Sequence, residues 1–183
     1  MVEDLTPFDF DHIFFKNYEK LIETEFTTQM ANNQTIQQLE DQIKNAFETH
    51  SSFCYETNFD HSPLFWAKKA KELGYFLELH FYCLETIEIA KNRVEIRTKN
   101  QGHPISDEII KYKWKLGYKN LNINYQFFDL VYLIDNSIDG EPPTVFLEIE
   151  KVNEDSFLVK QYVDCLPSYA ERRIPSIFNF ITN

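Results

Sequence analysis

A cationic stretch in an acidic chain is the first feature that could do chemistry. The 183 residues carry a formal net charge of -11, yet segment 91–119 holds eight Lys and Arg against three Asp and Glu. Arg93 and Arg97 are four residues apart, so on a helix they share one face. A planar guanidinium suits phosphate or carboxylate oxygens. The segment therefore predicts a site for a small anion, and the alternative is that both arginines are solvated surface charges.

The overall composition limits the partners of such a site. An acidic chain lacks the broad basic surface that neutralises nucleic-acid phosphates, so DNA and RNA are not expected as partners. Hydrophobic residues make up 43% of the sequence, which is typical of a globular protein. The first residues are acidic where a signal peptide is basic, and no run approaches the roughly 18 apolar residues of a membrane span. We therefore expect a cytoplasmic protein without a membrane segment.

The cysteines do not indicate a redox or metal function. Cys54, Cys83 and Cys165 are odd in number, widely spaced and form no CxxC pair. Neither a disulfide framework nor a zinc site follows from this pattern, and no other cluster suggests a metal site. The cysteines are expected to be small buried hydrophobic residues.

Apolar periodicity and turn residues predict the elements that must position these side chains. Segments 51–57 and 76–84 are apolar, rich in aromatic residues and of strand length. Between them, Ser62 and the proline after it start a helix, and Gly74 ends it. Strand, helix and strand in this order predict a βαβ unit with parallel pairing. The chain is expected to form one α/β domain over residues 1–183.

Further elements follow from the same rules. They are a helix over 86–99 with Ile87, Ala90 and Val94 as its buried stripe, a helix capped by Ser106, strands over 127–135 and 144–152, a helix over 36–47 and a short helix over 17–26. The polar segment 32–38 is interpreted as a loop, and the strand over 144–152 as antiparallel or at an edge. Asp135 and Asn136 are expected to stabilise a turn.

An ordered series of motifs resembles the zeta toxin and UDP-N-acetylglucosamine kinase family of P-loop kinases. The motifs are FDFDHI at 8–13, FCYETNF at 53–59, KKAKELGY at 68–75, RVEIRTKNQGHPI at 93–105, FDLVYLIDNS at 128–137 and CLPSYA at 165–170. The resemblance covers most of the chain. It implies a three-layer, doubly wound and mainly parallel sheet with helices on both faces. It also implies ATP-dependent phosphoryl transfer to a sugar nucleotide, with magnesium carried by the ATP.

The resemblance implies roles for particular residues. Asp11 would accept the proton of a sugar hydroxyl as the catalytic base. Glu56 and Thr57 would hold the sugar substrate at the carboxyl end of a parallel strand. Arg93 and Arg97 would lie across the triphosphate as catalytic residues of a phosphate-facing lid.

Two further residues, Lys113 and His103, would belong to the same phosphate-facing lid. For several of these residues a structural role remains open. Asp11 could form a strand-end turn, Glu56 could be a cap or a loop partner, and His103 could be a turn residue with local hydrogen bonds.

The motif that holds the phosphates in this family is absent from the chain. GxxxxGK[ST] places backbone amides and a lysine around the phosphates, but the four glycines stand at 74, 102, 117 and 140, and only ten residues precede Asp11. The first strand and the P-loop are therefore expected to be missing. Other departures from the family pattern are Gln101, Asn58 and Lys113, and lysine loses the bidentate fork of arginine.

Two hypotheses follow from this pattern. The first is a degenerate kinase domain without phosphotransferase activity that retains a sugar-nucleotide or anion site. The alternative is an active kinase represented here by an N-terminally truncated chain. Loss of a central strand would expose hydrophobic sheet edges, which predicts a rearranged sheet, self-association or a partner that donates a strand. An antitoxin is a further partner that the family implies.

Overall fold

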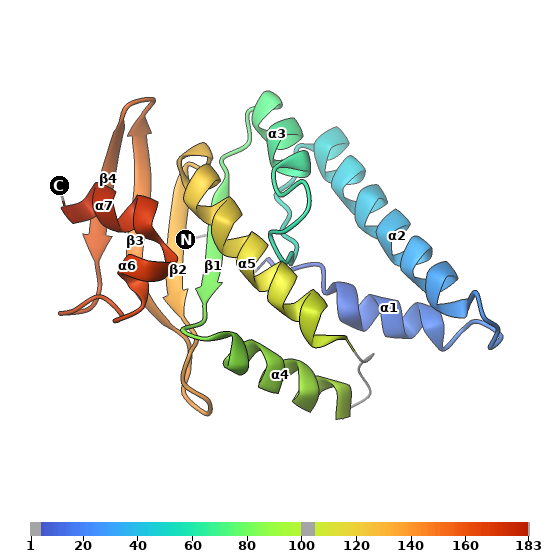
Figure 1. Ribbon diagram of the computed structural model, residues 1–183. Helices are drawn as coiled ribbons and strands as arrows, with labels where there is room; N and C mark the ends of the chain where they lie inside the picture. The colour runs from blue at the N-terminus through green and yellow to red at the C-terminus, as the bar shows by residue number, and fades with distance from the viewer. Residues whose placement is uncertain (1–4, 100–104, 183) are drawn as a thin grey trace. The chain divides into compact units, whose positions relative to one another are not determined.

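The computed structural model describes residues 5–99 and 105–182. The chain divides into two compact units, Met1–Thr57 and Asn58–Asn183. Figure 1 labels the elements of both units. The expectation of one domain over residues 1–183 stays a prediction.

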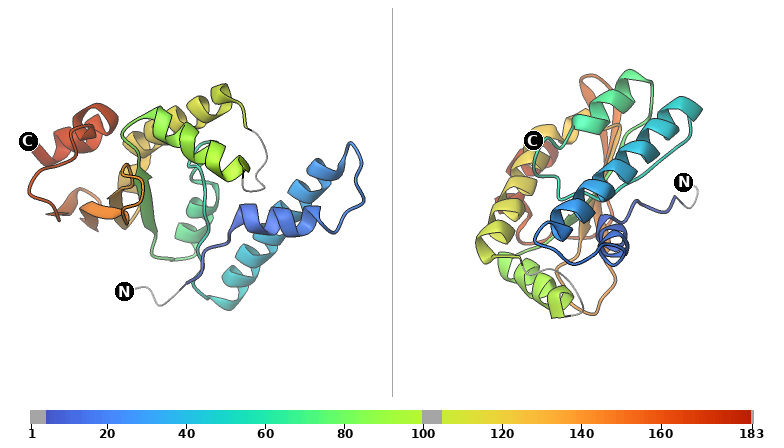
Figure 2. Two further views of the ribbon diagram at one scale, coloured as in Figure 1. Left: turned by 90° about the horizontal axis from the view of Figure 1, so that it is seen from below. Right: turned by 90° about the vertical axis from the view of Figure 1, so that its right-hand side faces the viewer.

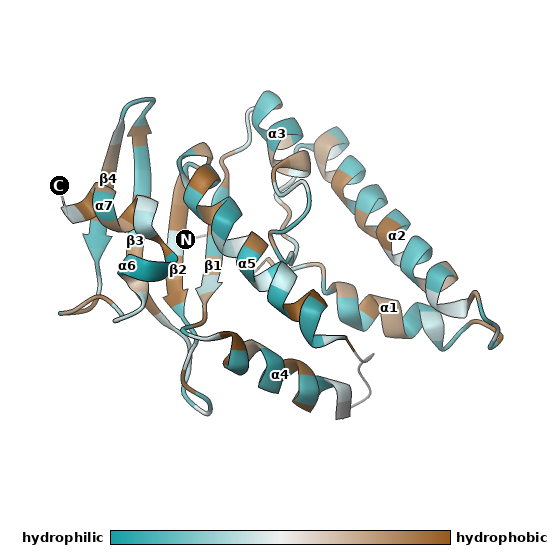
Figure 3. Ribbon diagram, in the orientation of Figure 1, coloured by the Kyte–Doolittle hydropathy of each residue, from teal (hydrophilic) through white to brown (hydrophobic). Residues whose placement is uncertain are grey.

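The first unit is a pair of helices, α1 (Phe10–Tyr18) and α2 (Thr27–Thr49). α1 begins after Asp9, whose carboxylate accepts a hydrogen bond from the His12 amide at 2.9 Å. A buried polar contact joins the two helices, because the Asn17 amide donates to the Thr35 hydroxyl at 3.0 Å. Figure 3 shows that α2 is mainly hydrophilic, so only one narrow stripe of it is buried.

Two sequence expectations for the first unit are wrong. Segment 32–38 is not a loop, since α2 runs through it without a break. The buried residues Ala31 and Thr35 continue the stripe that Ile43 and Ala46 complete, and the polar side chains between them face outward. The short helix expected over 17–26 ends at Tyr18 instead, and turns follow.

The second unit contains a four-stranded mixed sheet in the order β1-β2-β3-β4. The strands are β1 (Glu78–Cys83), β2 (Leu130–Asp135), β3 (Thr144–Asn153) and β4 (Ser156–Gln161). β1 pairs with β2 in parallel, whereas β2 with β3 and β3 with β4 are antiparallel. The α/β class is therefore confirmed, but this sheet is mixed and not mainly parallel. β3 is antiparallel as expected and lies inside the sheet, because the unpredicted β4 covers it.

The predicted βαβ unit between 51–57 and 76–84 is wrong. Segment 51–57 forms no strand, and its one isolated bridge joins Tyr55 to Phe8 within the first unit. The parallel neighbour of β1 is β2, which follows 46 residues later in the chain and not before it. An apolar run of strand length identifies a segment that can pair, but the partner is chosen by tertiary structure.

Helices lie against one face of this sheet, as Figures 1 and 2 show for α5, α6 and α7. The helices of the second unit are α3 (Phe65–Glu72), α4 (Ile87–Lys99), α5 (Asp107–Asn124), α6 (Ala170–Arg173) and α7 (Pro175–Thr182). The predicted caps are confirmed at Ser106, whose hydroxyl accepts from the Ile109 amide, and at Gly74, whose φ is +81°. Ser62 does not cap α3, which begins after Leu64.

The core of the second unit lies under these helices. β2 is largely apolar (Figure 3), and its Leu133 is fully buried next to Leu147 of β3. The same face carries the buried side chains of Val131 and Ile149. At the amino end of the strands, Asp129 accepts from the Leu77 amide at 2.8 Å and from the ammonium of Lys71 at 3.3 Å. This contact ties α3 to the sheet.

Among the residues that the structure describes, no helix combines the length and the apolar character that a membrane crossing requires.

We predict that two leucines of the antiparallel strands differ sharply in their contribution to stability. Leu147→Ala opens a cavity in the core, where Leu147 is 0% exposed, and should lower the free energy of unfolding by about 2–5 kcal/mol. Leu158→Ala makes the same change at a site that is 59% exposed and should stay within about 0.5 kcal/mol. Urea unfolding followed by circular dichroism measures both. Equal losses would contradict the placement of Leu147 in the core.

Candidate functional site

In the first unit, a short parallel contact positions the predicted catalytic base and substrate residues. The Phe8 amide donates to the Cys54 carbonyl at 3.0 Å, and the Glu56 amide donates to the Phe8 carbonyl at 3.4 Å. Both segments run in the same direction through the Phe8–Tyr55 bridge. Asp11 follows Phe8 by three residues and Glu56 follows Tyr55 directly, so both leave the bridge at its carboxyl end.

Asp11 lies in the first turn of α1 and is exposed. The expected strand end at 8–13 is therefore the start of a helix, because Asp9 caps the backbone amides that follow it. A carboxylate in a first helical turn interacts favourably with the helix dipole. Glu56 and Thr57 are also exposed.

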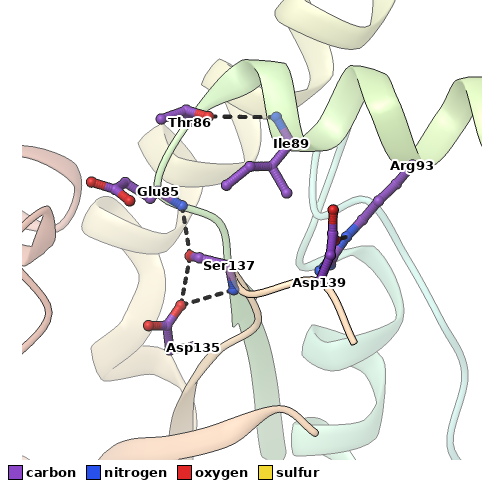
Figure 4. A network of polar contacts seen from close by, with 7 residues as sticks. All are labelled: Glu85, Thr86, Ile89, Arg93, Asp135, Ser137 and Asp139. Atoms are coloured by element: carbon purple, nitrogen blue, oxygen red, sulfur yellow. Dashed lines mark hydrogen bonds and ion pairs between the residues drawn. The ribbon is translucent and has the colours of Figure 1, made fainter. Parts of the chain in front are cut away.

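In the second unit, Arg93 and Arg97 lie on α4, as the periodicity predicts. Arg93 forms an ion pair with Asp139, which follows β2 in the turn toward β3, and the Nη2–Oδ1 distance is 3.3 Å (Figure 4). Arg97 is exposed one turn further along α4. The described side chains of α4 are half-buried or exposed, and the predicted stripe at 87, 90 and 94 is half-buried. α4 therefore displays its arginines on a lightly packed helix.

Lys113 lies on α5, where its ammonium is 3.8 Å from the carboxylate of Asp60. The chain at 58–60 lies against this helix, because a Cβ on Gly117 would stand 3.1 Å from the Asn58 carbonyl oxygen. The Asn120 amide also donates to the Phe59 carbonyl at 2.9 Å. Lys113 is thus held beside the segment that directly follows Glu56 and Thr57 in the chain.

The predicted residues therefore occupy three separate local settings. Asp11, Glu56 and Thr57 belong to the first unit, whereas Arg93 and Arg97 on α4 and Lys113 on α5 belong to the second. His103 lies outside the described residues. The structure brings Asp11 and the Glu56–Thr57 pair to one bridge, and it pairs Arg93 and Lys113 with carboxylates.

A hydrogen-bond network at the carboxyl ends of β1 and β2 holds the base of α4 (Figure 4). The Asp135 carboxylate accepts from the Ser137 amide at 3.0 Å and from the Ser137 hydroxyl at 2.6 Å. The Ser137 hydroxyl accepts from the Glu85 amide at 2.9 Å, and Thr86 accepts from the Ile89 amide at 3.4 Å. The turn-stabilising role of Asp135 is thus confirmed, and its connection to α4 was missed.

The C-terminal segment completes this network. The Tyr169 hydroxyl donates to Asp135 at 2.8 Å, and the Arg173 guanidinium donates to the Glu85 carbonyl at 3.1 and 3.2 Å. The guanidinium of Arg173 also lies 4.2 Å above the ring of Trp114. A conspicuous Asp-Asn-Ser turn was the available sequence signal, but the tyrosine and arginine partners are 34 and 88 residues away from the groups they contact.

Burial controls the ionisation of the side chains around this network. Burial raises the pKa of the Cys83 thiol to about 12, and it also raises the pKa of Tyr118 and Tyr169. The Tyr118 hydroxyl donates to the Leu84 carbonyl and accepts from the Leu84 amide, each at 2.8 Å. These groups stay protonated near neutral pH. Tyr118 and Tyr169 hold their neighbours by hydrogen bonds, and the neutral Cys83 thiol is a weak nucleophile.

Within residues 5–99 and 105–182, no group of three His, Cys, Asp or Glu side chains is arranged to hold a metal ion.

Comparison with known proteins gives one partial match. A protein of Haemophilus influenzae that is described as uncharacterized is 30% identical over 70 residues, which make up 38% of this chain and 50% of that protein. The match thus spans about half the length of the relative. No protein-family model matches the chain, and no solved structure matches it.

We predict that Cys83 makes folding stability depend on alkaline pH. The folded pKa of about 12 lies above the unfolded value of about 8.5, so this stability is complete below pH 8.5 and is lost as pH rises toward 12. Between pH 9 and 10 the free energy of unfolding should fall by about 1 kcal/mol through this thiol. Urea unfolding with a reducing agent at several pH values measures the slope.

Cys83→Ala should remove this part of the slope, although it also lowers stability at all pH values. Cys165→Ala deletes an exposed thiol and is the matched control, which should keep the wild-type slope. An unchanged slope in Cys83→Ala would contradict the buried, protonated thiol.

Proposed function

We propose that this chain is a degenerate zeta-toxin-like kinase domain that binds a sugar nucleotide and transfers no phosphoryl group by itself. In this proposal Glu56 and Thr57 hold the sugar, and Asp11 lies where the family's catalytic base lies. The proposed family is based on the ordered motifs from 8 to 170.

The parallel bridge between Phe8 and Tyr55 carries the proposal. It directs Asp11 and the Glu56–Thr57 pair to the same end of two aligned segments. A carboxylate acceptor and a hydroxyl are the groups that recognise sugar hydroxyls by hydrogen bonds. Two backbone hydrogen bonds form the bridge between these segments, and they join residues that are 46 and 48 positions apart.

The second unit supports the further proposal that the chain binds an anion. α4 follows β1 directly and presents Arg93 and Arg97 one turn apart. We propose that this helix is the counterpart of the family's phosphate-facing lid, and that the mixed sheet belongs to a three-layer arrangement like that of P-loop kinases. The parallel β1–β2 pair and the helices on one face of the sheet agree with the coarser α/β description.

The 183 residues contain no GxxxxGK[ST] motif. Without that loop, neither backbone amides nor a lysine surround the β and γ phosphates. We therefore propose that the chain by itself does not use ATP and magnesium as cofactors. The alternative is an active ATP-dependent kinase in which an upstream segment or another polypeptide supplies the strand and the loop. The presence of Asp11, Glu56, Thr57 and both arginines favours this alternative.

The strand that the chain lacks relative to the family also suggests partners that pair with the edge of the sheet. In the part of the chain that the structure describes, β1 pairs on its β2 side and with no other strand. An unpaired edge offers backbone donors and acceptors to another chain. We propose self-association or a strand-donating partner at this edge, and an antitoxin remains a partner that only the family resemblance suggests.

We predict that the chain binds UDP-N-acetylglucosamine and that Glu56 contributes most to the affinity. Glu56→Gln should weaken binding at least tenfold, because hydrogen bonds to a charged group contribute about 1.5–3 kcal/mol. Isothermal titration calorimetry measures the dissociation constants. Glu48→Gln removes an exposed carboxylate from α2 of the same unit and is the matched control, which should bind like the wild type. Equal binding by both variants would contradict the role of Glu56.

We also predict that the purified chain does not phosphorylate the sugar nucleotide. Incubation with magnesium ATP and UDP-N-acetylglucosamine should yield no phosphorylated product above the level of Asp11→Asn. Mass spectrometry of the nucleotide pool detects the product. Turnover that Asp11→Asn abolishes would overturn the degenerate assignment and establish the active kinase.

A further inference from the structure

The Asp139 carboxylate is hydrogen-bonded to the guanidinium of Arg93. Its Oδ1 atom lies 3.3 Å from Nη2 and 3.4 Å from Nε, so one oxygen accepts from both donors (Figure 4). The two side chains are 30% and 68% exposed, for Arg93 and Asp139 respectively. This is a partly solvated contact between α4 and the turn after β2.

Asp139 is placed there by a defined turn. The turn starts from the Asp135–Ser137 hydrogen bonds described above, and Gly140 adopts a φ of +82°, which a residue with a side chain rarely tolerates. The base of α4 is anchored to the same Ser137 through the Glu85 amide. One network therefore determines both sides of the Arg93–Asp139 contact.

The geometry of the contact leaves it open to competition. A bidentate carboxylate would give one oxygen to each guanidinium nitrogen, whereas here a single oxygen serves both. Exposed ion pairs contribute only about 0–1 kcal/mol. An anion with two adjacent charged groups offers more oxygens and more charge than Asp139 does. Such an anion displaces the carboxylate, and a singly charged one does so poorly.

We propose that Asp139 is an internal competitor for the anion site of Arg93, which lowers the affinity of that site for anions such as a diphosphate. The inference rests on the proposed function, because that proposal makes Arg93 face a phosphate group. It adds a residue that lowers anion affinity without belonging to the family motifs.

Asp139→Asn tests the inference directly. The amide keeps the size of the side chain and removes the competing charge, so the Asp139→Asn variant should bind inorganic pyrophosphate about three- to fivefold more tightly than the wild type does. Isothermal titration calorimetry at constant low ionic strength measures this change, and inorganic phosphate should gain by a similar factor if it binds at the same arginine.

A second carboxylate provides a matched control. Asp107 begins α5 and forms an ion pair with Lys91 of α4, the helix that also carries Arg93. Asp107→Asn therefore changes the net charge by the same amount as Asp139→Asn and also frees one cation of α4. Its pyrophosphate affinity should stay within about twofold of the wild type. If Asp107→Asn tightens binding as much as Asp139→Asn, the effect is one of general charge and the inference is overturned.

A double-mutant cycle links the effect to Arg93. In an Arg93→Gln background, Asp139→Asn should change pyrophosphate affinity by less than twofold. Thermal unfolding of each variant identifies any loss of folding, and Asp139→Glu serves as a variant that keeps the competing charge. Unchanged pyrophosphate affinity in folded Asp139→Asn, or absence of pyrophosphate binding in all variants, would overturn the inference.

The two proposals fail in different ways. If UDP-N-acetylglucosamine binds through Glu56 but Asp139→Asn leaves pyrophosphate binding unchanged, only the competitor role is lost. If Asp139→Asn tightens pyrophosphate binding and no sugar nucleotide binds, only the sugar-nucleotide site is lost.

Discussion

The parallel pairing of β1 with β2 is the constraint on which the second unit depends. Parallel neighbours require a long crossover, and the 46 residues between the two strands supply α4 and α5 for that purpose. Parallel strands also end at the same edge of the sheet. The Asn136 amide therefore reaches the Cys83 carbonyl at 3.0 Å, and the Asp135–Ser137 turn meets the chain where it leaves β1.

This edge determines how α4 is held. The base of the helix is fixed by hydrogen bonds from several directions, whereas its body contributes no fully buried side chain among the described residues. Elements with few buried apolar contacts open locally at low cost. The helix also makes polar contacts through the partly exposed Arg93–Asp139 and Lys91–Asp107 ion pairs. Charged ligands can alter such contacts far more easily than they can alter a packed core.

The sequence indicated some of these features because their causes are local. The Ser106 cap, the glycine after α3 and the helix α4 each follow from signals within a few residues, and all three are confirmed, although the stripe expected to be buried on α4 is only half-buried. Segment 32–38 misled because polar composition resembles a loop, although buried Ala31 and Thr35 show that a helix needs only one apolar stripe. The start of α1 was interpreted as a strand end because the FDFDHI motif resembles a strand end of the kinase family.

The sequence predicted which residues make up the candidate site, but it did not predict how they are arranged in space. The sequence by itself determined where α4 and α5 begin and where positive charge collects, because caps and charge patterns act over one or two helical turns. Only the tertiary structure decided that β1 pairs with β2, that Phe8 meets Tyr55 and that Arg93 faces Asp139. These contacts join residues that are 46 or more positions apart, and many alternative pairings satisfy the same apolar and charge patterns.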